Sequence, residues 1–255
     1  YTFAALLCTE NMLQTLSPEL AAYEARMTQS SAAAAVAASK CIVYTANKSA
    51  VATIIGFKMT ALSVVGLLHK PPATSIALSA FLPTLAIPGG GCRRVLLVLD
   101  KVNKPDNMGA LFRSALAFGA SGVLLGPGCC DPLVRKCIRS SMGAVFKLPY
   151  AHVKSWPAEL NQLRAEGFRL WALHLEGSVM LSAALADRRA TDGTAGEAQS
   201  IAVMVGAEYE GVGDEAAACA DERVRIRMSG AMDATLDSVN VNVAASVVLD
   251  RLFNP

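Results

Sequence analysis

Apolar residues recur along most of the chain in short runs, and stretches with helical periodicity lie between these runs. Runs of four to seven mostly apolar residues bounded by turn residues are typical of strands in a sheet covered on both faces. The pattern predicts strands at 94–100, 122–125, 144–148, 168–173, 201–205 and 223–226, and helices at 108–118, 132–141, 156–166, 213–220 and 241–253. Strands that alternate with helices of this length predict an α/β domain with a mostly parallel sheet.

A break in the pattern near residues 83–92 predicts a second, smaller domain. Pro83, Pro88 and three glycines at 89–91 interrupt the chain there. Upstream, we expect a helix from Pro18 with Ser17 as its cap, a strand at 41–45, helices within 48–68 and a strand at 75–82. The sequence therefore predicts a small α/β domain over residues 1–90 and a larger one over 93–255, with the boundary between Phe81 and Arg94. Residues 186–200 are expected to form an exposed loop.

The composition excludes some classes of protein but does not indicate a function. With 53% hydrophobic and 17% charged residues, the chain is too apolar to be disordered. Its net charge of +2 gives no strong basic field, although a local patch could still bind RNA. A spanning helix needs about 20 apolar residues. The most apolar stretch, 51–68, is interrupted by Lys58, Thr60 and Ser63, so we expect no membrane segment.

Cysteine and histidine spacing argues against metal and thiol chemistry. The seven cysteines include no C-x-x-C pair, so neither a disulfide framework nor a zinc site is expected, and a reducing compartment is favoured. The three histidines lie far apart in the sequence without a nucleophile or ligand pattern. We expect no metal and no histidine-based catalysis.

The loop at residues 100–113 follows a predicted strand, where ligand sites of α/β sheets concentrate. Asp106 or Asn107 could cap the next helix, and Gly109 would let another backbone approach its first turn. Arg113 stands among apolar residues. From this segment alone it could equally be a surface arginine packed by its stem or a functional cation.

Two further loops carry candidate residues. Gly206, Glu208 and Gly211 follow the strand at 201–205, but they lack the spacing of dinucleotide-binding and phosphate-binding loops. Ser238 precedes the last helix, where it is a good candidate for the N-cap. Each loop by itself is a weak signal.

Taken together and in order, the three loops resemble the motifs of one family. Asn107, Gly109 and Arg113 match an N-x-G-x3-R motif, and Gly206, Glu208 and Gly211 match a G-x-E-x-x-G motif. The third match is the segment 238–241, Ser-Val-Asn-Val, before the terminal helix. Over residues 93–255 the chain resembles the SpoU-type, TrmH-like branch of the SPOUT class of RNA 2′-O-ribose methyltransferases. The first 85 to 90 residues resemble, more loosely, the small RNA-binding module that often precedes this domain.

The resemblance implies a trefoil-knotted α/β fold that binds S-adenosylmethionine and works as a homodimer or as a dimer with a related chain. RNA is the implied partner, with ribosomal RNA or a ribosomal precursor favoured over transfer RNA. A mitochondrial location is favoured over the cytoplasm. By position, the implied catalytic residues are Asn107, Arg113, Glu208, Ser238 and Asn240, and the implied cofactor-binding residues are Gly206, Ile226, Met228 and Val239.

The chain also departs from the family pattern near the third motif. Arg227 replaces the usual proline, Val239 replaces a leucine, and residues 230–238 carry about four extra residues, with 234–237 as the expected insertion. An insertion beside the cofactor could weaken its binding. The alternative to an active enzyme is therefore a catalytically inactive RNA-binding assembly factor with the same fold.

Overall fold

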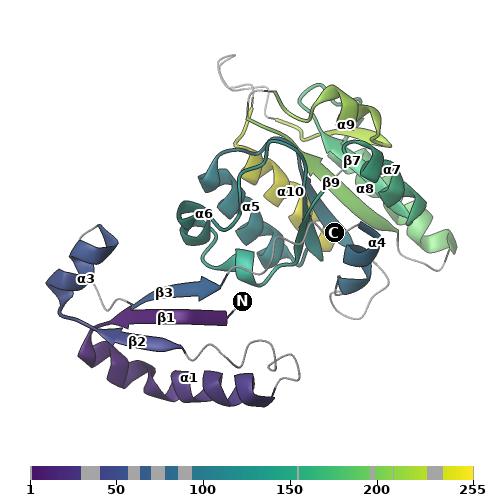
Figure 1. Cartoon of the computed structure of the whole chain (residues 1–255). Helices are drawn as coiled ribbons and strands as arrows, with labels where there is room; N and C mark the ends of the chain where they lie inside the picture. Colours follow the sequence, from purple (N-terminus) through teal and green to yellow (C-terminus); the bar gives the residue numbers. More distant parts are fainter. Residues whose placement is uncertain are drawn as a thin grey trace. The chain divides into compact units, whose positions relative to one another are not determined.

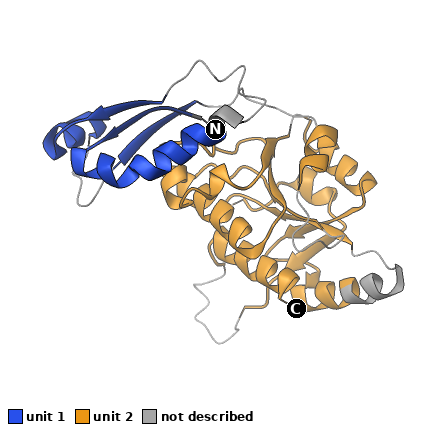
Figure 2. Cartoon of the chain, turned by 90° about the horizontal axis from the view of Figure 1, so that it is seen from below, with its two compact units in different colours: residues 1–73 blue, residues 74–255 orange. Residues whose placement is uncertain are grey.

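The computed structural model describes residues 2–29, 41–56, 64–69, 78–85, 94–153, 155–195, 199–208, 210–228 and 238–254. The chain forms two compact units, Tyr1–Ala73 and Thr74–Pro255 (Figure 2). The division falls earlier than the expected boundary at 83–92, because residues 78–85 pack with the larger unit. The spacing of Leu78, Phe81, Leu82 and Leu85 is helical, and all four side chains are buried in one core. The strand expected at 75–82 is therefore wrong, and α4 (Leu78–Phe81) and the 3₁₀ turn η1 (Leu82–Thr84) lie there.

The smaller unit is a three-stranded sheet in the order β2-β1-β3 with a long helix (Figure 1). Strand β1 pairs in parallel with β2 and antiparallel with β3. The ring of Phe3 lies edge-on to Tyr23 of helix α1, with centroids 5.4 Å apart, so α1 packs on this sheet. The elements are β1 (Thr2–Cys8), α1 (Glu10–Gln29), β2 (Ile42–Thr45), α3 (Lys48–Ile55) and β3 (Val64–His69).

Two expectations for this unit are corrected. Helix α1 continues through Pro18, and Ser17 does not cap it: its hydroxyl donates to the Leu13 carbonyl over 2.8 Å. Pro18 lacks the N–H that would bond to the Gln14 carbonyl, so the helix loses one backbone hydrogen bond there. Residues 64–69 form a strand rather than a helix, because they pair with β1, a strand that the sequence analysis did not anticipate.

The larger unit contains a seven-stranded sheet in the order β6-β5-β4-β9-β7-β10-β8, and every described pairing in it is parallel. This confirms the predicted α/β class with a mostly parallel sheet. The strands are β4 (Val95–Leu99), β5 (Gly122–Leu125), β6 (Tyr150–His152), β7 (Phe168–Leu173), β8 (Val179–Met180), β9 (Ser200–Val205) and β10 (Glu222–Arg225).

Helices cover both faces of this sheet, and the side chains of β4 alternate between the two cores. Leu97 and Leu99 face one core, whereas Leu96 and Val98 face the other, as the period of two along a strand requires. Helices α5 (Pro105–Phe118), α6 (Arg135–Ser140), α8 (Leu181–Ala195) and α10 (Val241–Phe253) contribute to or adjoin the first core. Helices α4, α7 (Ala158–Ala165) and α9 (Asp214–Ala218) contribute to the second.

Two expectations for the larger unit are wrong. Residues 144–148 are not a strand: Ala144, Val145 and Leu148 are buried at the spacing of a helical turn, and the 3₁₀ turn η3 (Ala144–Phe146) forms there. Residues 186–200 are not simply an exposed loop, because α8 runs to Ala195 and Arg188 is buried. The Arg188 guanidinium donates to the Leu252 carbonyl over 3.3 Å.

Some predictions are not tested by these elements. The trefoil knot and the RNA-binding role of the first 85 to 90 residues stay predictions. The expected insertion at 234–237 lies outside the described residues, as does all of 229–237. Within the described part of the chain, no helix is long and apolar enough to cross a membrane.

Candidate active site

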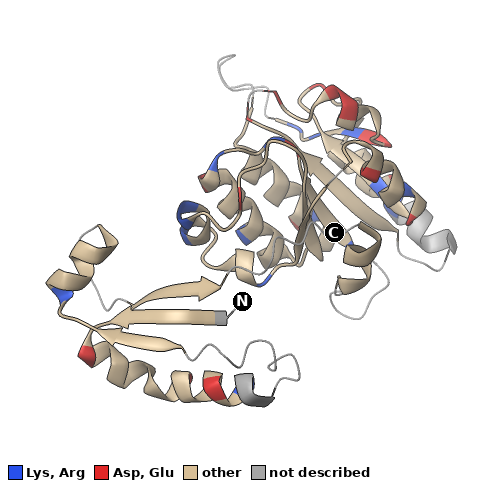
Figure 3. Cartoon of the chain, viewed as in Figure 1, with Lys and Arg blue, Asp and Glu red and all other residues tan. Residues whose placement is uncertain are grey.

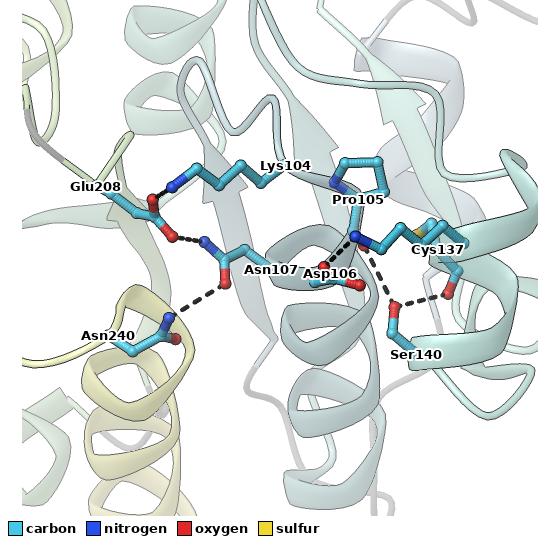
Figure 4. Close-up of polar contacts among 9 residues, drawn as sticks. Lys104, Pro105, Asp106, Asn107, Cys137, Ser140, Glu208 and Asn240 are labelled. Carbon is cyan, nitrogen blue, oxygen red and sulfur yellow. Dashed lines mark hydrogen bonds and ion pairs between the residues drawn. The ribbon is translucent and has the colours of Figure 1, made fainter.

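Polar side chains from three loops meet where β4 and β9 end and α10 begins. Asn107 lies in the first turn of α5, Glu208 follows β9, and Asn240 directly precedes α10. The Asn107 amide nitrogen donates to Glu208 Oε1, and the Asn240 amide nitrogen donates to Asn107 Oδ1 over 3.1 Å (Figure 4). Three of the five predicted polar residues are thus joined at the carboxyl edge of the sheet, where α/β proteins bind ligands.

Lys104 extends this chain of contacts to a fourth residue. Its ammonium forms an ion pair with Glu208 Oε2 (Figure 4). The Glu208 side chain is 25% exposed and that of Lys104 is 54% exposed, so the pair is partly shielded from water. Both carboxylate oxygens of Glu208 are therefore engaged. The sequence analysis missed Lys104, because a single lysine in a loop has no spacing that sets it apart from a solvated side chain.

The residues that cap the starts of α5 and α10 differ from those predicted from the sequence. Asn240, and not Ser238, caps α10: its side-chain oxygen accepts from the Asn242 N–H over 2.9 Å. Helix α5 begins at Pro105 with Lys104 at the N-cap, so neither Asp106 nor Asn107 caps it. Because α5 starts two residues before Asn107, the Asn107 amide is available to Glu208 and Asn240.

Arg113 and Ser238 are exposed, and neither takes part in the hydrogen-bonded chain. Among the described residues, neither side chain has a hydrogen bond or ion pair. Arg113 comes seven residues after Asp106, so both lie on the same face of α5. The structure thus leaves the guanidinium open at the surface, two turns from Asn107.

Gly206 is required by a tight fold in the loop after β9. A Cβ at this position would lie 1.7 Å from the Gly211 carbonyl oxygen and 2.2 Å from the Val212 nitrogen. The loop folds back through a bridge between Ala207 and Gly211, and Gly211 has φ +65°, a value that favours glycine. The site loop therefore depends on glycine at both of its ends.

Asp100, at the end of β4, holds the far end of that loop. Its Oδ2 accepts from the Gly213 N–H over 2.8 Å, and the residue is 1% exposed. Its other oxygen, Oδ1, is buried without a hydrogen-bond partner among the described residues. The sequence analysis did not select Asp100, although a carboxylate directly after an apolar strand could have drawn attention to it.

Gly109 brings α6 against the first turn of α5, as the sequence analysis expected. A Cβ there would lie 2.0 Å from Ser140 Oγ and 2.6 Å from the Cys137 carbonyl oxygen. The Ser140 hydroxyl lies 3.3 Å from the Pro105 carbonyl oxygen and 3.2 Å from that of Cys137 (Figure 4). The close approach fixes α6 relative to the turn that carries Asn107.

A polar network joins α5 to α10 beyond the site. The Ser114 hydroxyl donates to Asn242 Oδ1 over 2.8 Å, and the Ser246 hydroxyl lies 2.9 Å from Ser114 Oγ and 2.7 Å from the Asn242 carbonyl oxygen. These contacts fix how α5 and α10 lie against each other. They therefore support the meeting of Asn107 and Asn240 at the helix starts.

The residues near the third motif that were predicted to bind the cofactor are partly exposed. Ile226 packs against the larger unit's first core, whereas Met228 is 37% exposed and Val239 is 38% exposed. These apolar side chains flank the segment 229–237, which lies outside the described residues. They offer apolar surface near the carboxyl ends of the strands.

The thiols near the site are poorly suited to nucleophilic chemistry. Burial raises the pKa of Cys129, which follows β5, to about 12, and it raises the pKa of Cys137 on α6 to about 12. Both thiols therefore stay protonated at neutral pH. Within the described residues, no cluster of His, Cys, Asp and Glu side chains could hold a metal ion.

A comparison with protein families finds one that matches. Residues 94–250 match the model of the SpoU rRNA Methylase family. Among individual proteins, an uncharacterized tRNA/rRNA methyltransferase of Mycobacterium tuberculosis is 34% identical over 207 residues, which are 80% of this chain and 63% of that protein. The chain therefore spans about 63% of the length of this relative. A Bacillus subtilis protein named 23S rRNA (guanosine(2553)-2′-O)-methyltransferase is 29% identical over 159 residues, 62% of this chain and 58% of that protein.

Solved structures show a similar fold at low sequence identity. An AdoMet-bound rRNA methyltransferase from Sinorhizobium meliloti superposes with a TM-score of 0.67 at 24% identity, covering 98% of this chain and 79% of that one. The SpoU methyltransferase AviRb from Streptomyces viridochromogenes gives a TM-score of 0.67 at 21% identity, covering 98% of this chain and 80% of that one. The coverage includes both units of this chain.

Proposed function

The chain belongs to the SpoU rRNA methylase family, and we propose that it transfers a methyl group from S-adenosylmethionine to a ribose 2′-oxygen of RNA. One observation carries this proposal beyond family membership. The chain of contacts from Lys104 through Glu208 and Asn107 to Asn240 joins residues of all three motifs at one edge of the sheet. A site assembled in this way can hold a donor and an acceptor in a fixed relative orientation, which is what methyl transfer requires.

The residues present fit S-adenosylmethionine. Gly206, which has no room for a Cβ, and Gly211 let the loop after β9 turn tightly, which suits a ligand held by backbone groups. Ile226, Met228 and Val239 would contact the apolar parts of the cofactor. When bound, S-adenosylmethionine supplies a methyl group that its sulfonium has already activated.

The chain's own residues would orient the ribose and stabilise the charge that develops on its 2′-oxygen. A guanidinium stays protonated in proteins, so Arg113 is a poor base. We assign it to the phosphate beside the target ribose and to the developing alkoxide. Glu208, whose two oxygens are engaged by Lys104 and Asn107, would hold Asn107 in place. Asn107, Ser238 and Asn240 would supply oriented hydrogen bonds to the substrate.

Ribosomal RNA is the substrate we favour. The Bacillus subtilis relative is named for 2′-O-methylation of 23S rRNA, and the family is named for rRNA methylation. The smaller unit, with its separate sheet and helix, would add RNA-binding surface. The named relatives in the comparison are bacterial, so they give no support to a mitochondrial location, and the compartment stays a prediction.

We also propose that the protein acts as a dimer, with α10 at the interface. Val243 is 47% exposed and Val247 is 37% exposed on this helix, although the opposite side of α10 is fully buried. Apolar side chains on an otherwise covered helix are suited to a second packing partner. Sedimentation at assay concentration tests this, and a fully active monomer would contradict it.

Calorimetry with S-adenosylmethionine, followed by methyl transfer to RNA, tests the function. We expect saturable cofactor binding and transfer of a labelled methyl group to ribosomal RNA, with the label on a 2′-oxygen after nuclease digestion. RNA binding without cofactor binding at millimolar concentration would instead indicate the inactive assembly factor.

A further inference from the structure

Asp100 places a charge in an apolar part of the larger unit. The central strands β5, β4 and β9 contain no charged side chain (Figure 3). Asp100 directly follows β4, and at 1% exposed it is the most buried carboxylate that the structure describes. Taking a carboxylate out of water is strongly unfavourable unless hydrogen bonds and an opposite charge compensate it. The contacts of Asp100 therefore show how far its charge is compensated within the chain.

The described contacts of Asp100 account for only one of its two oxygens. Oδ2 accepts from the Gly213 N–H over 2.8 Å, whereas Oδ1 is buried with no hydrogen-bond partner among the described residues. The ammonium of Lys101 also lies near Gly213, but its ion pair is with Glu210, at 3.4 Å, and not with Asp100. Holding Gly213 requires one acceptor, which an uncharged asparagine would supply. Anchoring the loop therefore explains Oδ2 but not the charge.

The carboxylate lies beside the loop that we propose holds the cofactor. Strands β4 and β9 are paired at Leu99 and Val205, so Asp100 and Gly206 follow each other's neighbours at the same edge of the sheet. The Asp100 N–H donates to the Val205 carbonyl over 2.9 Å, and its side chain binds the far end of the same loop. A charge in this position is close to whatever the loop binds.

The chemistry of Oδ1 favours an organic cation as its partner. A buried carboxylate oxygen accepts hydrogen bonds and is stabilised by positive charge. A metal ion would need further ligands, and no group of three or more His, Cys, Asp or Glu side chains suited to a metal exists in the described part of the chain. S-adenosylmethionine carries two cations, the sulfonium and the α-ammonium of its amino-acid part.

We propose that Asp100 supplies, through Oδ1, the counter-charge for a cationic group of S-adenosylmethionine. The inference rests on the proposed function and deepens it, because it assigns a charged contact to a cofactor that the motif residues hold through backbone groups and apolar side chains. It also bears on product release. Methyl transfer turns the sulfonium into a neutral thioether, so a carboxylate paired with the sulfonium would favour S-adenosylmethionine over S-adenosylhomocysteine.

Calorimetry with the full chain and the Asp100→Asn variant tests this. Asparagine keeps an acceptor for the Gly213 N–H and removes the charge. We expect about 30-fold weaker S-adenosylmethionine binding, in the range for loss of a hydrogen bond to a charged group. The melting temperature of the ligand-free variant should stay equal or rise, because a buried charge without a described partner is gone.

Two further ligands identify which cation Asp100 contacts. If the sulfonium is the partner, S-adenosylhomocysteine should bind the variant and the wild type alike. If the α-ammonium is the partner, both ligands should lose affinity, whereas 5′-methylthioadenosine, which lacks the amino-acid part, should not. Equal losses for all three ligands would show that the substitution disturbs the loop, and would overturn the proposal.

Glu222→Gln is the matched control. Glu222 begins β10 at the opposite edge of the sheet, its side chain is 10% exposed, and its Oε2 is also buried with no hydrogen-bond partner among the described residues. Removing this charge should leave S-adenosylmethionine affinity unchanged. Unchanged affinity in Asp100→Asn, or a loss of affinity as large in the control, would overturn the proposal. A marked fall in the melting temperature of ligand-free Asp100→Asn would also overturn it, because a group of the chain itself would then already use Oδ1.

The outcome is separable from the proposed function. If the wild type binds S-adenosylmethionine and methylates RNA while Asp100→Asn matches it in affinity, only the inference about Asp100 fails. If cofactor binding depends on Asp100 as expected but the wild type transfers no methyl group to RNA, only the proposed function fails. A wild type that binds no S-adenosylmethionine would contradict both.

Discussion

The two halves of the candidate site differ in how their side chains are held. Asn107, Glu208 and Asn240 are bonded to one another, whereas Arg113 and Ser238 are exposed and make no such contacts among the described residues. Groups fixed before the reaction need no reorganisation when charge develops. Groups that must take hold of an incoming phosphate have to be accessible. In the proposed function, the bonded half would fix the geometry of the site and the open half would take hold of the RNA phosphate, so variants in the two halves should have different outcomes.

Arg113→Lys should give the largest effect on turnover. Lysine keeps the charge but loses the planar fork that holds a phosphate and an alkoxide together. We expect a loss on the order of 100- to 1,000-fold, as for removal of one donor to a developing oxyanion. Because Arg113 is exposed, S-adenosylmethionine affinity and melting temperature should barely change. Methyl transfer and calorimetry check this, and a lysine variant with wild-type turnover would remove Arg113 from the reaction.

Gly206→Ala should disrupt the bonded half. The new Cβ would lie 1.7 Å from the Gly211 carbonyl oxygen, so the loop that carries Glu208 has to move. We expect a loss of about 2 kcal/mol in the free energy of unfolding, as for overpacked sites, together with weaker cofactor binding. Urea denaturation and calorimetry measure the two effects. If stability falls but cofactor affinity is kept, the loop does not take part in cofactor binding.

Asn242→Ala tests whether the network between α5 and α10 positions the site. The variant leaves the Ser114 hydroxyl without its acceptor, which should cost about 1 kcal/mol of stability. If the network positions Asn107 relative to Asn240, kcat should also fall about fivefold while the KM for RNA stays constant. Asn242→Ser retains a polar group and should recover part of the loss. A stability loss with unchanged kcat would limit the network to a structural role.

Glu208→Gln should give the smallest effect on stability. The glutamine oxygen can still accept from Asn107, and only the ion pair with Lys104 is lost. Because Lys104 is 54% exposed, the expected loss is at most about 0.5 kcal/mol. Lys104→Gln removes the other partner of the same ion pair, and its free energy of unfolding should fall by a similar amount. A collapse of turnover in Glu208→Gln alone would show that the carboxylate acts on the substrate and not only on Asn107.

The sequence predicts the strands of the larger sheet better than the turns around them. Mostly apolar runs gave β4, β5, β7 and β9 close to their observed bounds, because a strand buried on both faces has few positions for polar residues; Arg169 in β7 is an exception, paired with Asp187 and Glu222. The short run at 144–148 failed, because five residues with three buried positions fit a helical turn as well as a strand. Strand β8, with two residues, leaves no periodic signal at all.

The residues of the candidate site could likewise be predicted only in part from the sequence. The motif spacing identified Asn107, Glu208 and Asn240, which the structure brings together. It did not identify Lys104, which pairs with Glu208, or Asp100, which accepts from the Gly213 N–H. Partners across a fold are set by which loops meet, and a local pattern does not contain that information. The caps were misassigned for a related reason: Ser238 and Asn240 are both good caps, and the helix start decides between them.

The position of β4 in the sheet determines which opening motions of the backbone can reach the candidate site. Its five residues are at most 1% exposed, and the strand lies between β5 and β9 with a core on each face. Amide hydrogens in such a strand exchange with solvent only when the whole unit opens. Asp100 and the start of α5 come directly after it. Asp100 and the start of α5 are therefore attached to the slowest-exchanging backbone expected in the larger unit, and opening of the edge strands β6 and β8 alone should leave them in place.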